Sequence, residues 1–217
     1  MKHLQLAIFD MDGLLFDTER IHFRAFQRTA KKLGFDFTFD TYLKVVGVTD
    51  EKGKEILKEI YGENSAILNA FDLYQGEVER IIQEEGIPVK PGVDRLLDTL
   101  DEKHIKKCIA SSSRPEVIER NIKLTGLFDR FDFYISGTEV KHGKPSPDIF
   151  LEALNRANVQ PEHALVLEDS YHGLQAAVNA GIRCIIIPDL IEPNDEMKDK
   201  AYRIFDHLGQ VAELLKN

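Results

Sequence analysis

The sequence predicts an α/β protein with a parallel-sheet core and an inserted all-helical domain. From Val93 onward, helical patterns alternate with short apolar runs, and this alternation favours a parallel sheet covered by helices. The apolar run Leu4–Phe9, which ends shortly before Gly13, indicates one further buried strand of the same sheet. Residues 16–87 carry helical patterns and no convincing strand, so we expect them to form the insertion.

The predicted elements can be placed in order by their periodicity and stop signals. The first helix is predicted to begin at Thr18 and to end at Gly34, because glycine commonly follows helix C-termini. Further helices are expected at roughly 51–61 and 64–85, before a stiff connector that contains prolines and a glycine. The later elements, beginning with a helix and alternating with strands, are 93–103, 105–110, 114–124, 131–136, 147–157, 164–167, 171–180 and 183–187.

These elements predict two domains. We expect a core domain of residues 1–15 and 88–217 and a helical domain of residues 16–87. The acidic stretch 192–200 is interpreted as a solvated loop.

Composition limits the class of protein and its partners. The 217 residues carry a formal net charge of -9, which argues against nucleic acid or an anionic membrane as partner. No apolar run approaches the ~18 residues needed to cross a membrane, and the N-terminus lacks the apolar segment of a signal peptide. Cys108 and Cys184 lie in apolar strand-like runs and are expected to be buried. We therefore expect a cytoplasmic monomer that acts on a small molecule.

Asp10 and Asp12 directly follow the first predicted strand. Side chains two residues apart project from the same face of a strand, so the two carboxylates begin on one side. At roughly 4 Å, two like charges repel by about 4 kcal/mol at an effective dielectric near 20, so a cation or a shared proton must offset them. An Asp-rich surface turn is the ordinary alternative. The buried strand favours a reaction centre with one carboxylate as nucleophile and the other as general acid/base.

Polar residues also follow the other predicted strands, where ligands of parallel sheets bind. Ser111–Ser113 offer hydroxyls and backbone N–H groups for an anion, while Ser113 and Glu116 form a capping-box pattern. Lys144 lies in a proline-stiffened loop, and Glu168–Asp169 form a second acidic pair. Each feature alone is also explained by a helix cap or a solvated charge. Together they outline a phosphoryl-transfer site for which Mg²⁺ is the suitable cation.

Four segments of the chain resemble the motifs of the haloacid dehalogenase superfamily, in the same order and at strand ends. They are Asp10-Met11-Asp12-Gly13, Ser111, Lys144-Pro145 and Glu168-Asp169. The resemblance implies a Rossmann-like core, and the insertion is similar to the helical cap of the subgroup with β-phosphoglucomutase and small sugar-phosphate phosphatases.

The resemblance also implies a role for each site residue. Asp10 would attack phosphorus to give an aspartyl-phosphate, and Asp12 would act as general acid and then general base. Mg²⁺ would be held by the Asp10 carboxylate, the Asp12 backbone carbonyl and Asp169, with Glu168 as a direct or water-mediated ligand. Ser111 and the Ser112 backbone N–H would bind the transferring phosphoryl group, and Lys144 would neutralise charge on that group and on Asp10.

The helical insertion is expected to decide the substrate. His22 stands where the mutase-like enzymes carry a cap histidine, although a partly buried helix histidine would look the same. In the segment Gly47–Asp50, Asp50 replaces the arginine of the mutase pattern, and Val46 replaces its lysine; Lys44, Lys52 or Lys54 could compensate. Fewer cationic contacts would weaken binding of a bisphosphorylated intermediate.

We therefore predict a phosphatase of a small phosphorylated metabolite such as a sugar or polyol phosphate. The alternatives are a β-phosphoglucomutase-like isomerase and a non-catalytic sensor of phosphate esters.

Overall fold

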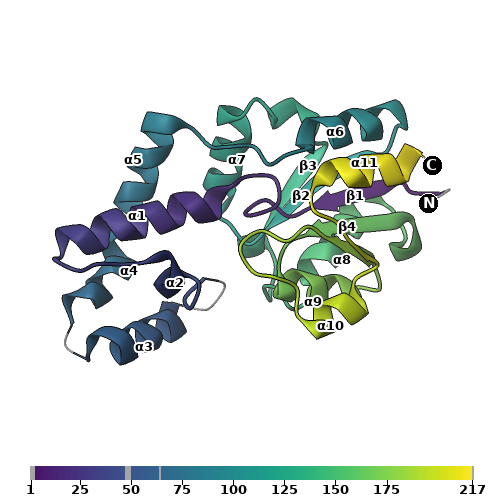
Figure 1. The fold of residues 1–217 in the computed structure, drawn as a ribbon. Helices are drawn as coiled ribbons and strands as arrows, with labels where there is room; N and C mark the ends of the chain where they lie inside the picture. The colour runs from purple at the N-terminus through teal and green to yellow at the C-terminus, as the bar shows by residue number, and fades with distance from the viewer. Residues whose placement is uncertain (1–2, 47–49, 64, 217) are drawn as a thin grey trace. The chain divides into compact units, whose positions relative to one another are not determined.

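The computed structural model describes residues 3–46, 50–63 and 65–216 (Figure 1). The chain divides into two compact units, one of Met1–Asp17 with Ile87–Asn217 and the other of Thr18–Gly86. We call them the core unit and the helical unit. None of the helices in the described ranges is both long enough and apolar enough to cross a membrane.

The core unit is built on a six-stranded sheet in the order β3-β2-β1-β4-β5-β6, and all its strand pairs are parallel. The predicted α/β fold with a parallel sheet is therefore confirmed. The first strand along the chain lies in the middle, where β1 pairs with β2 on one side and β4 on the other. The strands are β1 (Leu6–Phe9), β2 (Lys106–Ser111), β3 (Phe133–Ser136), β4 (Ala164–Glu168), β5 (Arg183–Ile186) and β6 (Arg203–Ile204).

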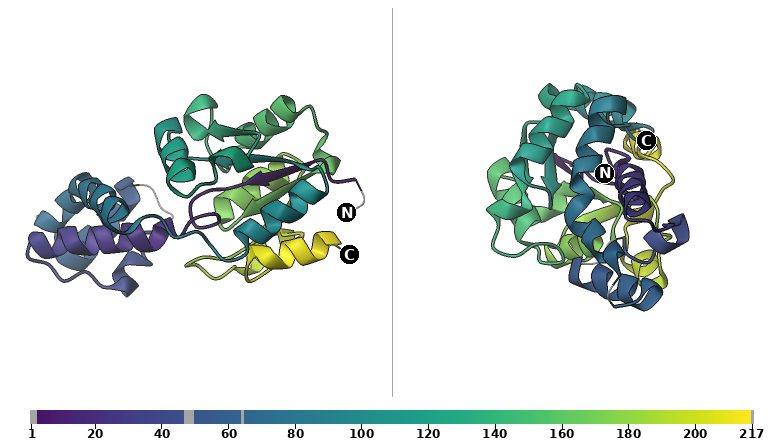
Figure 2. Two further views of the ribbon diagram at one scale, coloured as in Figure 1. Left: turned by 90° about the horizontal axis from the view of Figure 1, so that it is seen from above. Right: turned by 90° about the vertical axis from the view of Figure 1, so that its left-hand side faces the viewer.

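Helices cover both faces of this sheet (Figures 1 and 2). Leu6 and Ile8 of β1 are fully buried in the cluster that also holds the apolar residues of α8 and α9. Alternate residues of a strand face opposite sides, so Ala7 and Phe9, which are also buried, point to the other face. The helices of the core unit are α6 (Val93–Glu102), α7 (Pro115–Leu124), α8 (Asp148–Ala157), α9 (Tyr171–Asn179), α10 (Asp195–Lys200) and α11 (Leu208–Lys216).

The interpretation of residues 192–200 as a solvated loop was wrong, because most of the stretch forms α10. The Asn194 side chain caps this helix by accepting a hydrogen bond from Met197 N, and Met197 is buried. Met197 packs on the core, and Glu196 and Lys200 form hydrogen bonds with residues of α9, so both kinds of contact hold this short, charged helix in place.

The two segments that lead out of the core unit are joined to each other. Phe16 and Val89 form an antiparallel bridge, flanked by hydrogen bonds from Asp17 N to Pro88 O and from Lys90 N to Leu15 O, both 2.9 Å. The connector at 87–92 is therefore one side of a short ladder next to the loop that follows β1.

The helical unit contains α1 (Thr18–Lys32), α2 (Phe39–Tyr42), α3 (Asp50–Tyr61), α4 (Ala70–Leu73) and α5 (Gln75–Glu85), with the 3₁₀ helix η1 (Ala66–Asn69) before α4. The helix predicted at 64–85 is thus three shorter pieces. Phe26 of α1 is central to its packing, with ring contacts to Phe37, Phe71 and Tyr74. Aromatic pairs of this kind add to the stability that apolar burial provides.

Substituting Gly92 by alanine is expected to destabilise the core unit by about 3 kcal/mol or more. Gly92 has φ +86°, and a Cβ atom there would lie 2.2 Å from Gly209 N at the start of α11. Backbone strain and a clash with main chain would therefore act together, and urea unfolding of the variant measures their sum.

Gly181→Ala is the matched control, because Gly181 also has a positive φ, +71°, but nothing lies within 4 Å of its Cβ position. It is expected to cost only about 1 kcal/mol. If both variants lose the same free energy of unfolding, the contact between position 92 and Gly209 of α11 relaxes without an energetic cost.

Candidate active site

The polar residues that follow β1, β2 and β4 meet at one edge of the sheet. Asp10 directly follows β1, Ser111 ends β2 and Glu168 ends β4. The register aligns Phe9, the last residue of β1, with Ile109 and with Leu167, so β2 and β4 end within two residues of the end of β1. Asp10 N donates a hydrogen bond to Leu167 O at 3.0 Å, which continues the pairing past the end of β1.

Lys144 connects these strand ends through its ammonium group. Lys144 Nζ lies 2.5 Å from Asp10 Oδ1 and 2.7 Å from Glu168 Oε1, and it donates to Ala110 O at 3.0 Å. The Lys144 side chain is 6% exposed, so this is no solvated surface charge. Burial alone would lower the pKa of Lys144, but Asp10 and Glu168 raise it above its ordinary value and keep the ammonium charged.

Asp10 is a buried carboxylate in a site with excess negative charge. Burial raises the pKa of Asp10 well above its ordinary value; Lys144 opposes this effect, and the charges of Glu168 and Asp12 add to it. One ammonium group therefore does not fully compensate the carboxylates that surround it. A further cation at this edge of the sheet would stabilise the ionised form of Asp10.

Glu168 is fully buried, and protein groups occupy both of its carboxylate oxygens. Oε1 contacts Lys144, while Oε2 accepts hydrogen bonds from Asp169 N at 3.0 Å and from Ser170 N and Oγ, both at 2.9 Å. Burial would raise the pKa of Glu168, but Lys144 and the bonds from Ser170 lower it below its ordinary value. Glu168 thus stays ionised and ties Lys144 to the first turn of α9.

Glycine at position 173 makes the close contact between Glu168 and α9 possible. A Cβ atom on Gly173 would lie 1.8 Å from Glu168 Oε1. Any larger residue would push the helix away from the carboxylate. The Gly173 position is therefore part of the packing that fixes Glu168, and no motif in the sequence indicated it.

Asp12 is contacted by a residue that we expected to have another role. The Ser113 hydroxyl Oγ donates a hydrogen bond to Asp12 Oδ2 at 2.8 Å. The backbone of Ser113 is fixed by two more hydrogen bonds, in which Ser113 N donates to Ser111 Oγ at 3.0 Å and Ser136 Oγ donates to Ser113 O at 2.7 Å. The predicted capping box of Ser113 with Glu116 was wrong, because Arg114 is the N-cap residue of α7 and no side chain caps it. Ser113 instead holds the second carboxylate of the first motif.

The two serines predicted to bind phosphate lie beside Ser113. Ser111 is buried and Ser112 is exposed. The backbone of Gly137 lies close to that of Ser112, because a Cβ atom on Gly137 would lie 3.0 Å from Ser112 Cα. The structure therefore gathers the predicted residues at one sheet edge, through direct contacts or shared partners: Asp10, Asp12, Ser111, Lys144 and Glu168.

Asp169 packs over the glycine of the first motif. A Cβ atom on Gly13, which has φ +83°, would lie 2.3 Å from Asp169 Oδ2, so only glycine fits beneath this carboxylate. Burial raises the pKa of Asp169 well above its ordinary value, and the charges of Glu168 and Asp10 add to the effect. Asp169 is therefore a second carboxylate that a bound cation would stabilise.

The donor set at this edge fits Mg²⁺. Oxygen atoms of carboxylates and carbonyls are its preferred protein ligands, and it commonly uses only one or two carboxylates together with water and substrate oxygens. Within the described residues, no three side chains of His, Cys, Asp or Glu form a group that could hold a metal by themselves.

The remaining predicted residues belong to the helical unit. The ring of His22 lies 5.8 Å from that of Tyr74, in the aromatic packing of this unit. Lys52 Nζ pairs with Glu55 at 3.0 Å and Lys54 Nζ with Asp72 at 3.1 Å. Gly47, together with the side chain of Asp50, lies outside the described residues.

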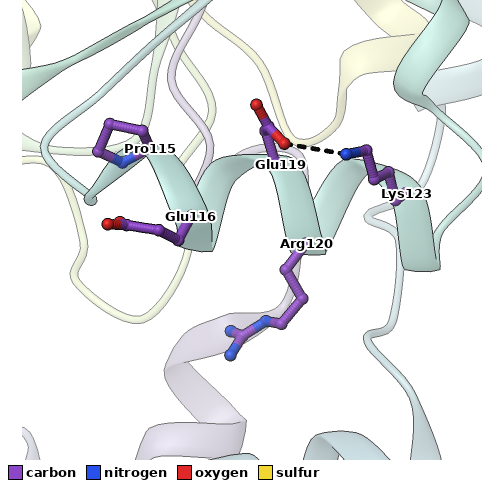
Figure 3. Close-up of a pocket in the computed structure, with 5 residues that line it drawn as sticks. All are labelled: Pro115, Glu116, Glu119, Arg120 and Lys123. Carbon is purple, nitrogen blue, oxygen red and sulfur yellow. Dashed lines mark hydrogen bonds and ion pairs between the residues drawn. The ribbon is translucent and has the colours of Figure 1, made fainter.

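A surface pocket on α7 contains none of the predicted site residues (Figure 3). Its lining includes an ion pair between Lys123 Nζ and Glu119 at 2.9 Å. All of its lining residues come from one helix: Pro115, Glu116, Glu119, Arg120 and Lys123. Because only one element shapes it, we assign it no role in the chemistry.

The buried carboxylates around Lys144 lie at the carboxyl edge of a parallel sheet, where proteins of the α/β class bind their ligands. Residues 7–187 match the sequence model described as haloacid dehalogenase-like hydrolase, and the chain belongs to this family.

Relatives and solved structures within the family carry several names. The chain is 37% identical over 183 residues to "Phosphorylated carbohydrates phosphatase" of Thermotoga maritima, with 84% of each chain covered. It is 30% identical to "Beta-phosphoglucomutase" of Bacillus subtilis, with 82% of this chain and 81% of that protein covered. The crystal structure of CbbY from Rhodobacter sphaeroides in complex with phosphate superposes with a TM-score of 0.75 at 29% identity, covering 96% of both chains.

Proposed function

We propose that this hydrolase is a Mg²⁺-dependent phosphatase of a small phosphorylated metabolite, a sugar or polyol phosphate. The observation that carries the proposal is the buried Lys144 ammonium, 2.5 Å from Asp10 and 2.7 Å from Glu168 at the sheet edge. A fixed cation beside a carboxylate suits the transfer of a phosphoryl group, because catalysis of that reaction depends chiefly on positioning and charge stabilisation. The name of the relative from Thermotoga maritima supports phosphorylated carbohydrates as the substrate class.

The proposed reaction has two steps. In the first, an Asp10 oxygen forms a bond to phosphorus, the bond from phosphorus to the ester oxygen breaks, and Asp12 gives its proton to that leaving oxygen. In the second, water attacks the aspartyl-phosphate, Asp12 accepts a proton from the water, and the bond between Asp10 and phosphorus breaks to release phosphate. Asp10 and protonated Asp12 are then restored.

The other residues bind and orient the phosphoryl group in this proposal. The Ser111 hydroxyl and the Ser112 backbone N–H would donate to its oxygens, and Lys144 would offset its charge. The Asp10 and Asp169 carboxylates with the Asp12 carbonyl would hold Mg²⁺, which when bound supplies charge neutralisation at those oxygens. Glu168 would orient Lys144 and α9 rather than ligate the metal directly, because protein groups already contact both of its oxygens.

We propose that the helical unit acts as a cap that selects the substrate, with His22 among its contributing residues. A β-phosphoglucomutase-like isomerase is the second candidate, favoured by the 30% identity to the enzyme of Bacillus subtilis. The residues Val46 and Asp50 favour hydrolysis, since neither supplies the positive charge that would hold a second phosphate.

The test is phosphate release from a panel of sugar, polyol and short-acid phosphates, with Mg²⁺ or with EDTA, for the wild type and Asp10→Asn. Metal-dependent release that the substitution abolishes is the expected result. Absence of release, together with coupled formation of glucose 6-phosphate from glucose 1-phosphate, would show the mutase instead. A chain that binds these esters without turnover of any of them would be a sensor.

Ser113→Ala is expected to lower kcat about tenfold with little change in KM. The substitution removes the hydrogen bond from Ser113 Oγ to Asp12 Oδ2, and an intramolecular hydrogen bond contributes about 0.5–1.5 kcal/mol. Asp12 would then be positioned less often for proton transfer, whereas the groups that bind phosphate remain. Steady-state kinetics measure the split between kcat and KM.

Ser113→Thr keeps the hydroxyl and is expected to recover most of the activity. If the alanine variant keeps the kcat of the wild type, the contact between Ser113 and Asp12 has no part in proton transfer. A rise in KM alone would place Ser113 in substrate binding instead.

A further inference from the structure

A buried ion pair outside the proposed machinery lies against the first motif. Lys90 Nζ contacts Asp189 Oδ1 at 2.6 Å, and their side chains are 15% and 2% exposed. Lys90 belongs to the connector after the helical unit, and Asp189 follows β5. The backbone of Lys90 is also fixed, because its N–H donates to Leu15 O at 2.9 Å in the loop after β1.

The second oxygen of Asp189 faces the proposed metal ligand Asp169. A Cβ atom on Gly13 would lie 3.5 Å from Asp189 Oδ2 and 2.3 Å from Asp169 Oδ2. Two atoms at those distances from one point are less than about 6 Å apart, a separation at which charges in a protein interior interact appreciably. The two carboxylates are therefore neighbours at Gly13, and Asp189 contacts Lys90 through its other oxygen.

This order of charges has a definite electrostatic effect on a cation held by Asp169. The negative end of the pair lies near Asp169, and the positive end contacts the other oxygen of Asp189. The Asp189 charge also contributes to the raised pKa of Asp169. A cation at Asp169 is therefore attracted by Asp189 and repelled by Lys90.

We propose that Lys90 and Asp189 are positioning residues that set the divalent-metal affinity of the site, with Asp189 strengthening it and Lys90 limiting it. The inference rests on the proposed function, since it assumes that Asp10, Asp12 and Asp169 hold Mg²⁺. It adds to that function a pair of residues that touch neither substrate nor metal. Partners behind the direct ligands commonly change metal affinity by roughly 10- to 100-fold.

The experiment measures metal binding without turnover. Mn²⁺, which takes the same oxygen ligands, is titrated into metal-free protein and followed by the electron paramagnetic resonance signal of free Mn²⁺, with Mg²⁺ as competitor. Asp189→Asn is expected to raise the Kd for Mn²⁺ about tenfold. Lys90→Met is expected to lower it about threefold, because loss of the ammonium group leaves the attraction of Asp189 uncompensated.

Two further variants separate charge from damage to the fold. Lys90→Arg keeps the charge and is expected to keep the Kd of the wild type. The double variant Lys90→Met with Asp189→Asn removes both charges, and its Kd for Mn²⁺ is expected to lie between those of the two single variants. Lys107→Met is the matched control, because Lys107 is also buried and pairs with Asp101, but at the start of β2. It is expected to leave the Kd unchanged.

Opposite shifts in the two single variants support the inference, because a disturbed fold would weaken binding in both. Unchanged affinity in both variants, or equal weakening, would overturn it while the proposed phosphatase stands. If the wild type binds no Mn²⁺ and releases phosphate equally in EDTA, the metal requirement is wrong and the inference falls with it.

Discussion

Replacing Lys144 by methionine is expected to lower kcat for phosphate release about 1,000-fold, which corresponds to about 4 kcal/mol of transition-state stabilisation. The substitution removes the cation 2.5 Å from Asp10 and 2.7 Å from Glu168. Asp10 would then be a buried carboxylate without the positive charge that opposes the effect of burial on its pKa. The nucleophile and the transferring phosphoryl group lose the same counter-charge, so both chemical steps are affected.

The same variant is expected to be less stable by about 3 kcal/mol, because loss of one partner leaves buried charges uncompensated. Lys141→Met is the control, since Lys141 lies in the same loop but is exposed. It is expected to leave both kcat and the free energy of unfolding near the wild-type values. A Lys144→Met variant that folds and retains more than about a tenth of the wild-type kcat would remove Lys144 from the proposed mechanism.

The sheet and the strand-end residues could be predicted because they depend on local patterns and one general rule. The apolar run that forms β1 is short and continuous, and parallel strands all end at one edge, so Asp10 and Glu168 had to lie near each other. Other elements lack such signals. The strand β6 has two residues, and the helix expected at 64–85 is interrupted where η1, α4 and α5 succeed one another.

Contacts between distant segments could not be predicted from the sequence. Asp12 and Ser113 are 101 positions apart, and Lys90 and Asp189 are 99 apart. The local pattern around Ser113 suggested a helix cap, because a capping box is defined only by near neighbours. In the folded chain the ends of β1 and β2 lie side by side, and the Ser113 hydroxyl reaches the carboxylate instead.

Substitution of Glu168 by glutamine is expected to destabilise the metal-free protein by about 3 kcal/mol and to lower kcat about 100-fold. The carboxylate accepts from Lys144 on one oxygen and from Asp169 N and Ser170 on the other. An amide has one oxygen and one NH₂ group, so in either orientation a donor faces another donor. Lys144 or the first turn of α9 must then move, and the counter-charge beside Asp10 shifts with it.

Metal-free conditions separate this orienting role from direct ligation of a metal. If Glu168 served chiefly as a ligand, its neutralisation would relieve repulsion with Asp10 and Asp169, and the protein in EDTA would become more stable. Asp169→Asn is the matched comparison, because burial already raises the pKa of Asp169 and disfavours its charge. We expect Asp169→Asn to weaken Mn²⁺ binding without loss of metal-free stability, and Glu168→Gln to lose that stability. Urea unfolding in EDTA measures the stability of both variants. If the Glu168→Gln variant is as stable as the wild type, Glu168 acts as a direct metal ligand rather than as an orienting residue.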